Sequence, residues 1–145
     1  MARFAMAASL QRRIAIVVDP APPIGLLGNA IAVCAVDLGA ASPDLGGARL
    51  RQAAGRSVRS SATVSLPALQ ATADPLLALL DEALASPKLD AVVGVPVFAR
   101  AIHDSATCRL GVENCDVAGA QIAALGIARE AEAVRRITRG LSLLR

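Results

Sequence analysis

Continuous apolar runs alternate with helical periods along the chain, and this order predicts strands alternating with helices. The run 14–18 is rich in β-branched residues, which is typical of a strand buried on both faces. Further strands are expected at 62–69, 90–98 and 122–128, and helices at 24–39, 74–86, 130–139 and within 101–119. The segment 41–61 is expected to form a loop or an irregular hairpin. Together these elements predict an α/β fold, with a small, mostly parallel four-stranded sheet and helices on both faces.

Prolines and glycines mark the ends of the expected helices. Pro22 and Pro23 precede the first helix, and Gly39 is expected to end it. Asp74 is expected to cap the next helix, with Pro75 at its first position. The leucines expected to be buried in that helix are Leu76, Leu77, Leu80 and Leu84.

The first helix is apolar on nearly all sides. Its body carries only one charge, Asp37, whereas a surface helix normally keeps a polar face. The complete stripe expected to face the core is Leu27, Ile31, Cys34 and Leu38. The opposite face carries Ala32, Val33 and Val36, and exposed apolar patches of this kind usually mark contact sites. We therefore expect the second face to lie in a homodimer interface or under another element.

Length and composition indicate one domain. The chain has 145 residues, of which 54% are apolar and 1% aromatic, so the core is expected to consist of Ala, Val, Leu and Ile. Residues 1–11 are expected to form a disordered leader, and 12–145 a single α/β domain. The net charge of +3 supports a nucleic-acid partner only weakly, and that partner stays open.

Two further features bear on location. The longest uncharged run that could be helical, 24–36, is shorter than the roughly 20 residues that span a bilayer, so no membrane partner is expected. Cys34, Cys108 and Cys115 make an odd number of cysteines in a chain that shows no export signal. This combination indicates reduced thiols and a cytoplasmic location.

The turn PPIGLLGNA contains the first candidate binding site. Gly25, Gly28 and Asn29 lie near the expected start of the first helix, where unpaired backbone N–H groups can bind a small anion. The G-x-x-G spacing matches neither dinucleotide folds nor P-loops. We favour the structural alternative, in which the glycines permit close packing of the helix. No cofactor is expected.

A second candidate site is the polar cluster His103, Asp104 and Ser105, which Cys108 and Cys115 follow. It suggests a Cys–His nucleophile or a metal site. Paired C-x-x-C ligands are absent, however, so no bound metal is expected, and a polar loop with unreactive thiols is the preferred alternative. Two groups of arginines could contact phosphates: Arg49, Arg51, Arg56 and Arg59, and Arg129, Arg135, Arg136 and Arg139.

Two blocks of the sequence resemble a known bacterial family. They are RIAIVVDPAPPIGLLGNAIAVCAVDLGA near the start and IAALGIAREAEAVRRITRGLSLLR at the end. Both resemble domain of unknown function 2000, a family without a settled activity whose fold is that of type 2 peptidyl-tRNA hydrolases. The similarity begins at about Arg12 and is poor at 41–61 and 99–119. It implies a hydrolase-like fold and, because these hydrolases are commonly dimers, a homodimer.

The motifs of the hydrolases are only partly present. Those enzymes cleave the ester between a peptide and tRNA with a G-K-[apolar]-A-A-Q-C-A-H helix start and a D-A-G-R-T-Q-I segment. Here Gly28, Cys34 and Asp116 match, but Asn29 stands at the lysine position and Ala120 at the threonine position. The resemblance therefore implies that the lysine–aspartate–threonine chemistry cannot operate on these residues.

Two classes of function remain after this comparison. The preferred one is a non-catalytic, homodimeric binding or regulatory protein. The alternative is a divergent hydrolase that acts on an ester or a nucleotide-linked substrate through Asp116, together with His103 or Asn29. A small anion bound near Gly28 and Asp116 would favour the hydrolase, and a flat apolar surface there would favour the binding protein.

Overall fold

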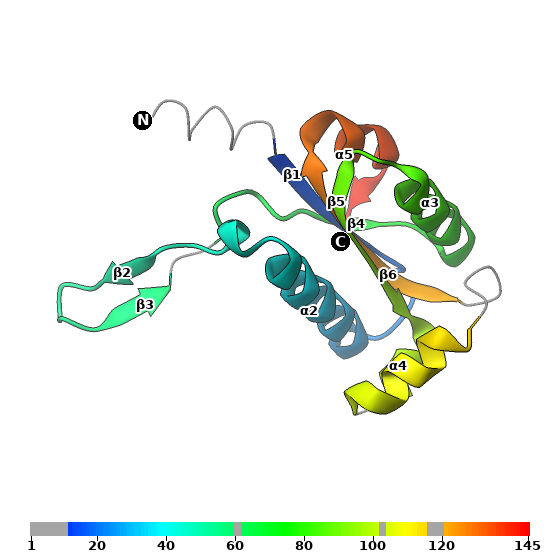
Figure 1. The fold of residues 1–145 in the computed structure, drawn as a ribbon, viewed down its shortest axis with the longest axis horizontal. Coiled ribbons are helices and arrows are strands. Elements are labelled where there is room, and N and C mark those ends of the chain that lie inside the picture. The colour runs from blue at the N-terminus through cyan, green and yellow to red at the C-terminus, as the bar shows by residue number, and fades with distance from the viewer. Residues whose placement is uncertain (1–11, 60–61, 102–103, 116–120) are drawn as a thin grey trace.

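The computed structural model describes residues 12–59, 62–101, 104–115 and 121–145. The expected leader, His103, Asp116 and Ala120 lie outside the described residues. In chain order the elements are β1 (Arg12–Val18), α2 (Ile24–Ala41), η1 (Pro43–Leu45), β2 (Arg49–Arg51), β3 (Ser57–Arg59), β4 (Ala68–Gln70), α3 (Ala73–Ala85), β5 (Leu89–Pro96), η2 (Val97–Ala101), α4 (Ser105–Glu113), β6 (Ile122–Glu130), α5 (Ala131–Ile137) and β7 (Ser142–Leu143) (Figure 1).

The main sheet is mixed and five-stranded, in the order β5-β6-β1-β4-β7. The pair β1–β4 is parallel, whereas β1–β6, β5–β6 and β4–β7 are antiparallel. The prediction of an α/β fold is therefore confirmed, but the predicted four-stranded, mostly parallel sheet is wrong. The C-terminal tail packs on the body as β7, which adds the fifth strand.

The position of α4 explains why the relative direction of the strands differs from the prediction. A helix between two strands makes them parallel only when it crosses back over the sheet. Here α4 lies beyond the end of β5 and β6 instead (Figure 1). The chain re-enters the sheet close to where it left, since the N–H of Val97 donates to the carbonyl of Gln121 at 2.8 Å. The two strands consequently run antiparallel.

Helices cover both faces of the sheet, as predicted. On one face α2 packs against Ile14, Ile16 and Val18 of β1. On the other face α3 and α5 pack against Ala15 and Val17 of the same strand. Because side chains alternate along a strand, β1 contributes to both cores and is buried on both faces, which confirms the interpretation of 14–18.

Several element boundaries differ from those predicted. The strand expected at 62–69 covers only Ala68–Gln70, since Pro67 has no N–H to donate to a ladder. The first long helix continues two residues past Gly39. The next helix begins at Ala73 with Thr72 as its N-cap, so Asp74 lies inside the first turn. The buried leucine stripe ends early, because Leu84 is 59% exposed.

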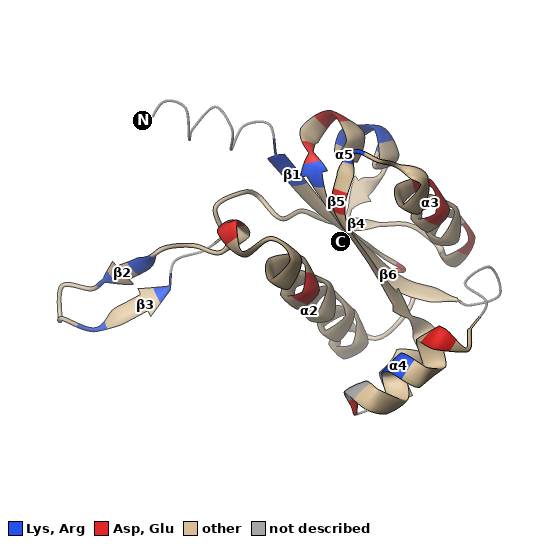
Figure 2. Cartoon of the chain, viewed as in Figure 1, with Lys and Arg blue, Asp and Glu red and all other residues tan. Residues whose placement is uncertain are grey.

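A hairpin of β2 and β3 projects from the body as a basic arm (Figures 1 and 2). Its described residues 49–59 are all exposed, and this part of the chain was expected to be a loop or an irregular hairpin. Arg49 lies directly opposite Arg59, and Leu50 opposite Val58. The arm therefore presents like charges on one face and apolar side chains on the other.

An ion-pair cluster joins β1, β5 and β6 at one end of the sheet. The register of β5 against β6 shifts between Leu89 and Ala91, which makes Asp90 the extra residue of a bulge. Its carboxylate contacts the guanidinium groups of Arg12, at 3.6 Å, and of Arg129. The bulge thus directs a carboxylate toward two arginines of neighbouring strands.

Candidate functional site

The predicted anion site at the start of α2 has an apolar and open surface. Gly25, Gly28 and Asn29 are all exposed, and the side chain of Ile24 is 80% exposed. Apart from the neighbouring residues and the backbone of the helix itself, no described heavy atom lies within 4 Å of a Cβ built on either glycine. The expectation that the glycines permit close packing is therefore wrong within one chain.

The backbone and charges at this helix start also argue against a bound anion. The N–H groups of Leu26 and Leu27 already donate to the carbonyl of Pro23, at 2.9 and 3.2 Å. In the preceding turn, the carboxylate of Asp19 accepts the N–H of Ala21 at 3.0 Å and adds a negative charge. The described residues thus bring together no cation and few unpaired N–H groups at this point.

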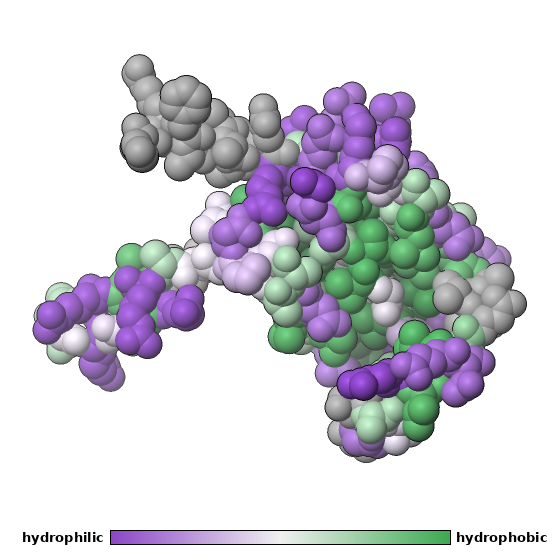
Figure 3. All heavy atoms as spheres, in the orientation of Figure 1, coloured by the Kyte–Doolittle hydropathy of each residue, from purple (hydrophilic) through white to green (hydrophobic). Residues whose placement is uncertain are grey.

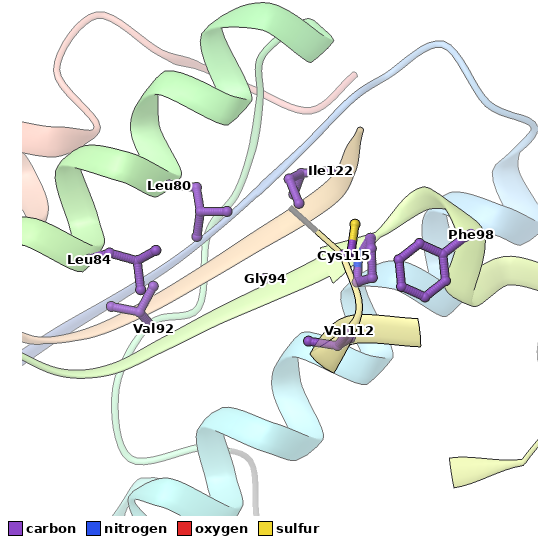
Figure 4. A pocket seen from close by; sticks show the side chains of 9 residues that line it. Leu80, Leu84, Val92, Gly94, Phe98, Val112, Cys115 and Ile122 are labelled. Carbon is purple, nitrogen blue, oxygen red and sulfur yellow. The ribbon is translucent and has the colours of Figure 1, made fainter. Parts of the chain in front are cut away.

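A different concavity, which we call the edge pocket, lies beside β5 on the α3 face of the sheet (Figure 4). β5 is the edge strand of the sheet formed by the described residues. The pocket has a volume of about 230 Å³. Its lining residues are Leu80 and Leu84 of α3, Val92, Gly94 and Pro96 of β5, Phe98 of η2, Val112 of α4, Cys115, and Ile122 of β6.

Tight packing at one end holds α4 beside the edge pocket. A Cβ built on Gly111 would lie 2.7 Å from Cε2 of Phe98, so the glycine lets α4 approach the ring closely. The side chain of Asp104 caps the helix by accepting the N–H of Thr107 at 2.7 Å. This hydrogen bond also lowers the pKa of Asp104. The predicted polar cluster therefore contributes a helix cap through Asp104, whereas His103 lies outside the described residues.

The chemistry of the edge pocket is that of a binding site for an apolar group. Among the described residues that line it, none carries a charge, and the thiol of Cys115 is the one ionisable group. Such a lining can exclude water and hold a hydrophobic ligand. Sequence reasoning missed this pocket. The signals that could have revealed it are the alternation Val92, Gly94, Pro96 and the last leucine of the α3 stripe.

The three cysteines occupy different environments, and none of them forms a disulfide. Cys34 of α2 is fully buried against the sheet, and this burial, together with the nearby Asp37 carboxylate, raises its pKa to about 12. Its thiol is therefore inert at neutral pH. Cys108 and Cys115 are half-buried around α4. Within the part of the chain that the structure describes, no three His, Cys, Asp or Glu residues are grouped so that they could hold a metal ion.

The outward face of α2 is the second apolar surface of the molecule. Only Leu27, Ala30, Cys34 and Leu38 of its 18 residues are buried. Of the predicted interface residues, Ala32 is exposed, Val33 is 38% exposed and Val36 is 69% exposed. By length and composition this helix could also cross a membrane, as core helices and signal sequences could. In the single chain, the outward face of this helix is apolar and exposed.

The fold and the edge pocket together define a small α/β protein with an apolar cavity at the edge of a mixed sheet. The chain belongs to the family described as protein of unknown function DUF2000, whose model matches residues 12–145. It is similar to a solved structure, a protein of unknown function, Atu0240, from Agrobacterium tumefaciens strain C58. The TM-score is 0.84 at 15% identity, over 92% of this chain and 97% of that one, which shows a shared fold. A comparison with curated proteins gave no match.

Proposed function

We propose that this protein is a non-catalytic binding protein that works as a homodimer, and that its two copies meet through the outward face of α2. The observation that carries the proposal is the exposure of that face. An 18-residue helix with four buried residues leaves an apolar surface in water, and such surfaces usually mark contacts. The interface residues are Ala32, Val33 and Val36.

The glycines of α2 support a close helix–helix contact. Gly28, inside the helix, costs it roughly 1 kcal/mol relative to Ala, and Gly25 lies in the first turn. Within one chain their missing side chains make room for no described atom, because nothing lies within 4 Å of either Cβ position. A second copy of α2 packed against this face would use that space. Small residues allow two helix backbones to approach closely, so the glycines fit a dimer better than a monomer.

We further propose that the chain has the type 2 peptidyl-tRNA hydrolase-like fold without its activity. Asn29, at the position of the hydrolase lysine, is neutral and exposed. Losing one such electrostatic group typically lowers a rate about a hundredfold to a thousandfold. With a labelled peptidyl-tRNA we expect little or no turnover, and a rate comparable to that of a genuine hydrolase would contradict the proposal.

Sedimentation velocity tests the dimer. The wild type is expected to sediment as a dimer, and the double variant Val33→Glu/Val36→Glu as a monomer, because the new charges would be buried in a dry contact. Val36→Glu alone gives a second measurement if the double variant precipitates. The matched control is Leu143→Glu, which changes a residue that is 60% exposed on β7 and should leave the dimer intact.

Two results would overturn the homodimer. The first is a wild-type monomer at concentrations of tens of micromolar. The second is flotation of the wild type with lipid vesicles that is lost in Val36→Glu, because the outward face of α2 would then bind a membrane instead of a second copy.

A further inference from the structure

We propose that the edge pocket binds a neutral alkyl chain of about eight carbon atoms. The pocket lies on the α3 face of the sheet, whereas α2 covers the opposite face. The proposal is therefore independent of the dimer. It names a site and a ligand class for a part of the molecule that the association through α2 does not use.

The shape of the edge pocket favours a chain over a compact ring. Val92, Gly94 and Pro96 are alternate residues of one strand, so the lining follows β5 over four residue steps, or about 13 Å at roughly 3.3 Å per residue. The volume of about 230 Å³ corresponds to about eight water-sized groups of roughly 30 Å³ each. A long cavity with room for about eight such groups fits an extended alkyl chain.

The chemistry of the lining excludes a charged ligand from the pocket interior. An ion placed against these side chains would lose its hydration without gaining a partner of opposite charge among the described lining residues. The rim includes Leu84, which is 59% exposed, and Val112, which is 48% exposed. Green apolar surface gathers between α2, α3 and α4 in the space-filling view (Figure 3). A bound chain would remove Leu84 and Val112 from water while its polar end stays outside.

Gly94 keeps the edge pocket open. A glycine inside a strand weakens it, so its presence in the middle of β5 calls for a compensating gain. A Cβ built on Gly94 would lie 3.5 Å from Cδ1 of Leu80, an ordinary contact, so the fold itself does not exclude a side chain there. The missing side chain instead leaves the space that the ligand needs. A leucine at this position would occupy that space.

A homologous series of 1-alkanols, titrated by calorimetry, tests the site directly. Each added CH₂ should tighten binding about fourfold while the chain still lies within the pocket. The gain should stop at about eight to ten carbons, because longer chains extend into water. Affinity that keeps rising through dodecanol would indicate non-specific adsorption, and absence of binding at all lengths would refute the site. Tighter binding of toluene than of 1-octanol would refute an extended chain.

Three variants locate the binding. Gly94→Leu should lower the affinity for 1-octanol at least tenfold, whereas the matched control Ala85→Leu, an exposed residue of α3 outside the lining, should not. Leu84→Ala, which removes part of the rim without touching the core, should weaken binding severalfold. In a Cys108→Ala variant, 1-octanol should slow alkylation of Cys115, because Cys115 lines the pocket. The measured rate reports on Cys115, since Cys34 is unreactive at neutral pH. Unchanged binding in both Gly94→Leu and Leu84→Ala would overturn the assignment.

Discussion

The packing of α2 on the sheet depends on Gly126 of β6, a residue without a side chain. A Cβ built there would lie 3.1 Å from Cδ1 of Leu38 and 3.3 Å from Cβ of Cys34. The methyl group of Leu38 could rotate away. The Cβ of Cys34 is fixed to the helix backbone, so α2 itself would have to move by a few tenths of an ångström. Gly126→Ala therefore tests how tightly the helix packs on the sheet.

Two opposing effects set the size of the change. Replacing a glycine by alanine restricts the unfolded chain and stabilises a protein by about 0.4–1 kcal/mol where the backbone tolerates it. Overpacking a tight core costs about 1–3 kcal/mol. At Gly126 both contacts are shorter than ordinary van der Waals distance, so overpacking should exceed the entropic gain. We expect a net loss of about 1 kcal/mol for Gly126→Ala and a larger loss for Gly126→Val.

Urea unfolding followed by circular dichroism measures this difference. The control is Gly39→Ala in the last turn of α2, where no described heavy atom beyond the neighbouring residues and the helix's own backbone lies within 4 Å of the Cβ position. The same substitution there should stabilise the protein by about 0.5–1 kcal/mol through helix propensity. Opposite signs for the two variants are expected. If Gly126→Ala proved as stabilising as Gly39→Ala, α2 would not be packed tightly on β6, and the reasoning from these contacts would fail.

Three further predictions follow from the described residues. Burial raises the pKa of Cys34 to about 12, whereas in the unfolded chain it is near 9; the contribution of this neutral thiol is complete below pH 9 and is lost as the pH rises toward 12. Urea titrations should therefore show the wild type losing about 1 kcal/mol more than Cys34→Ala between pH 9 and 10. Gly111→Ala would push the ring of Phe98 aside, which should offset the helix-propensity gain, so it should stabilise the protein less than Gly39→Ala in the same assay. Arg49→Glu, opposite Arg59, replaces a like-charge pair by an attractive one and should slow amide exchange in the arm roughly two- to fivefold.

The parts of the fold that the sequence predicted are those fixed by local pattern. β1 and β6 are continuous apolar runs, and both are almost wholly buried. The direction of the sheet was not predictable in this way, because it depends on where α4 lies. The segment 101–119 has no clear apolar period, so nothing in it distinguishes a helix that crosses the sheet from one that lies beyond its end.

The candidate site was less predictable than the fold. The lining of the edge pocket comes from four separate stretches of chain, and no short motif connects them. Leu84 was expected in the core because it continues a stripe at helical spacing. The structure directs it to the edge pocket instead, since the buried positions of α3 are Leu76, Leu80 and Ala83. The predicted catalytic residues Asp116 and His103 lie outside the described residues, so their roles stay predictions.

The two apolar surfaces can be separated because the sheet lies between them. Side chains at alternate positions of β5 point to opposite faces: Ala91 and Val95 pack with α2, whereas Val92 lines the edge pocket. Val36→Glu should therefore abolish the dimer and leave the affinity for 1-alkanols unchanged. Gly94→Leu should weaken the binding of 1-alkanols and leave the dimer intact. If each variant impaired both properties, the ligand and the second copy would share one continuous surface around the free edge of β5. Independent losses would instead establish two functions on two faces of one sheet.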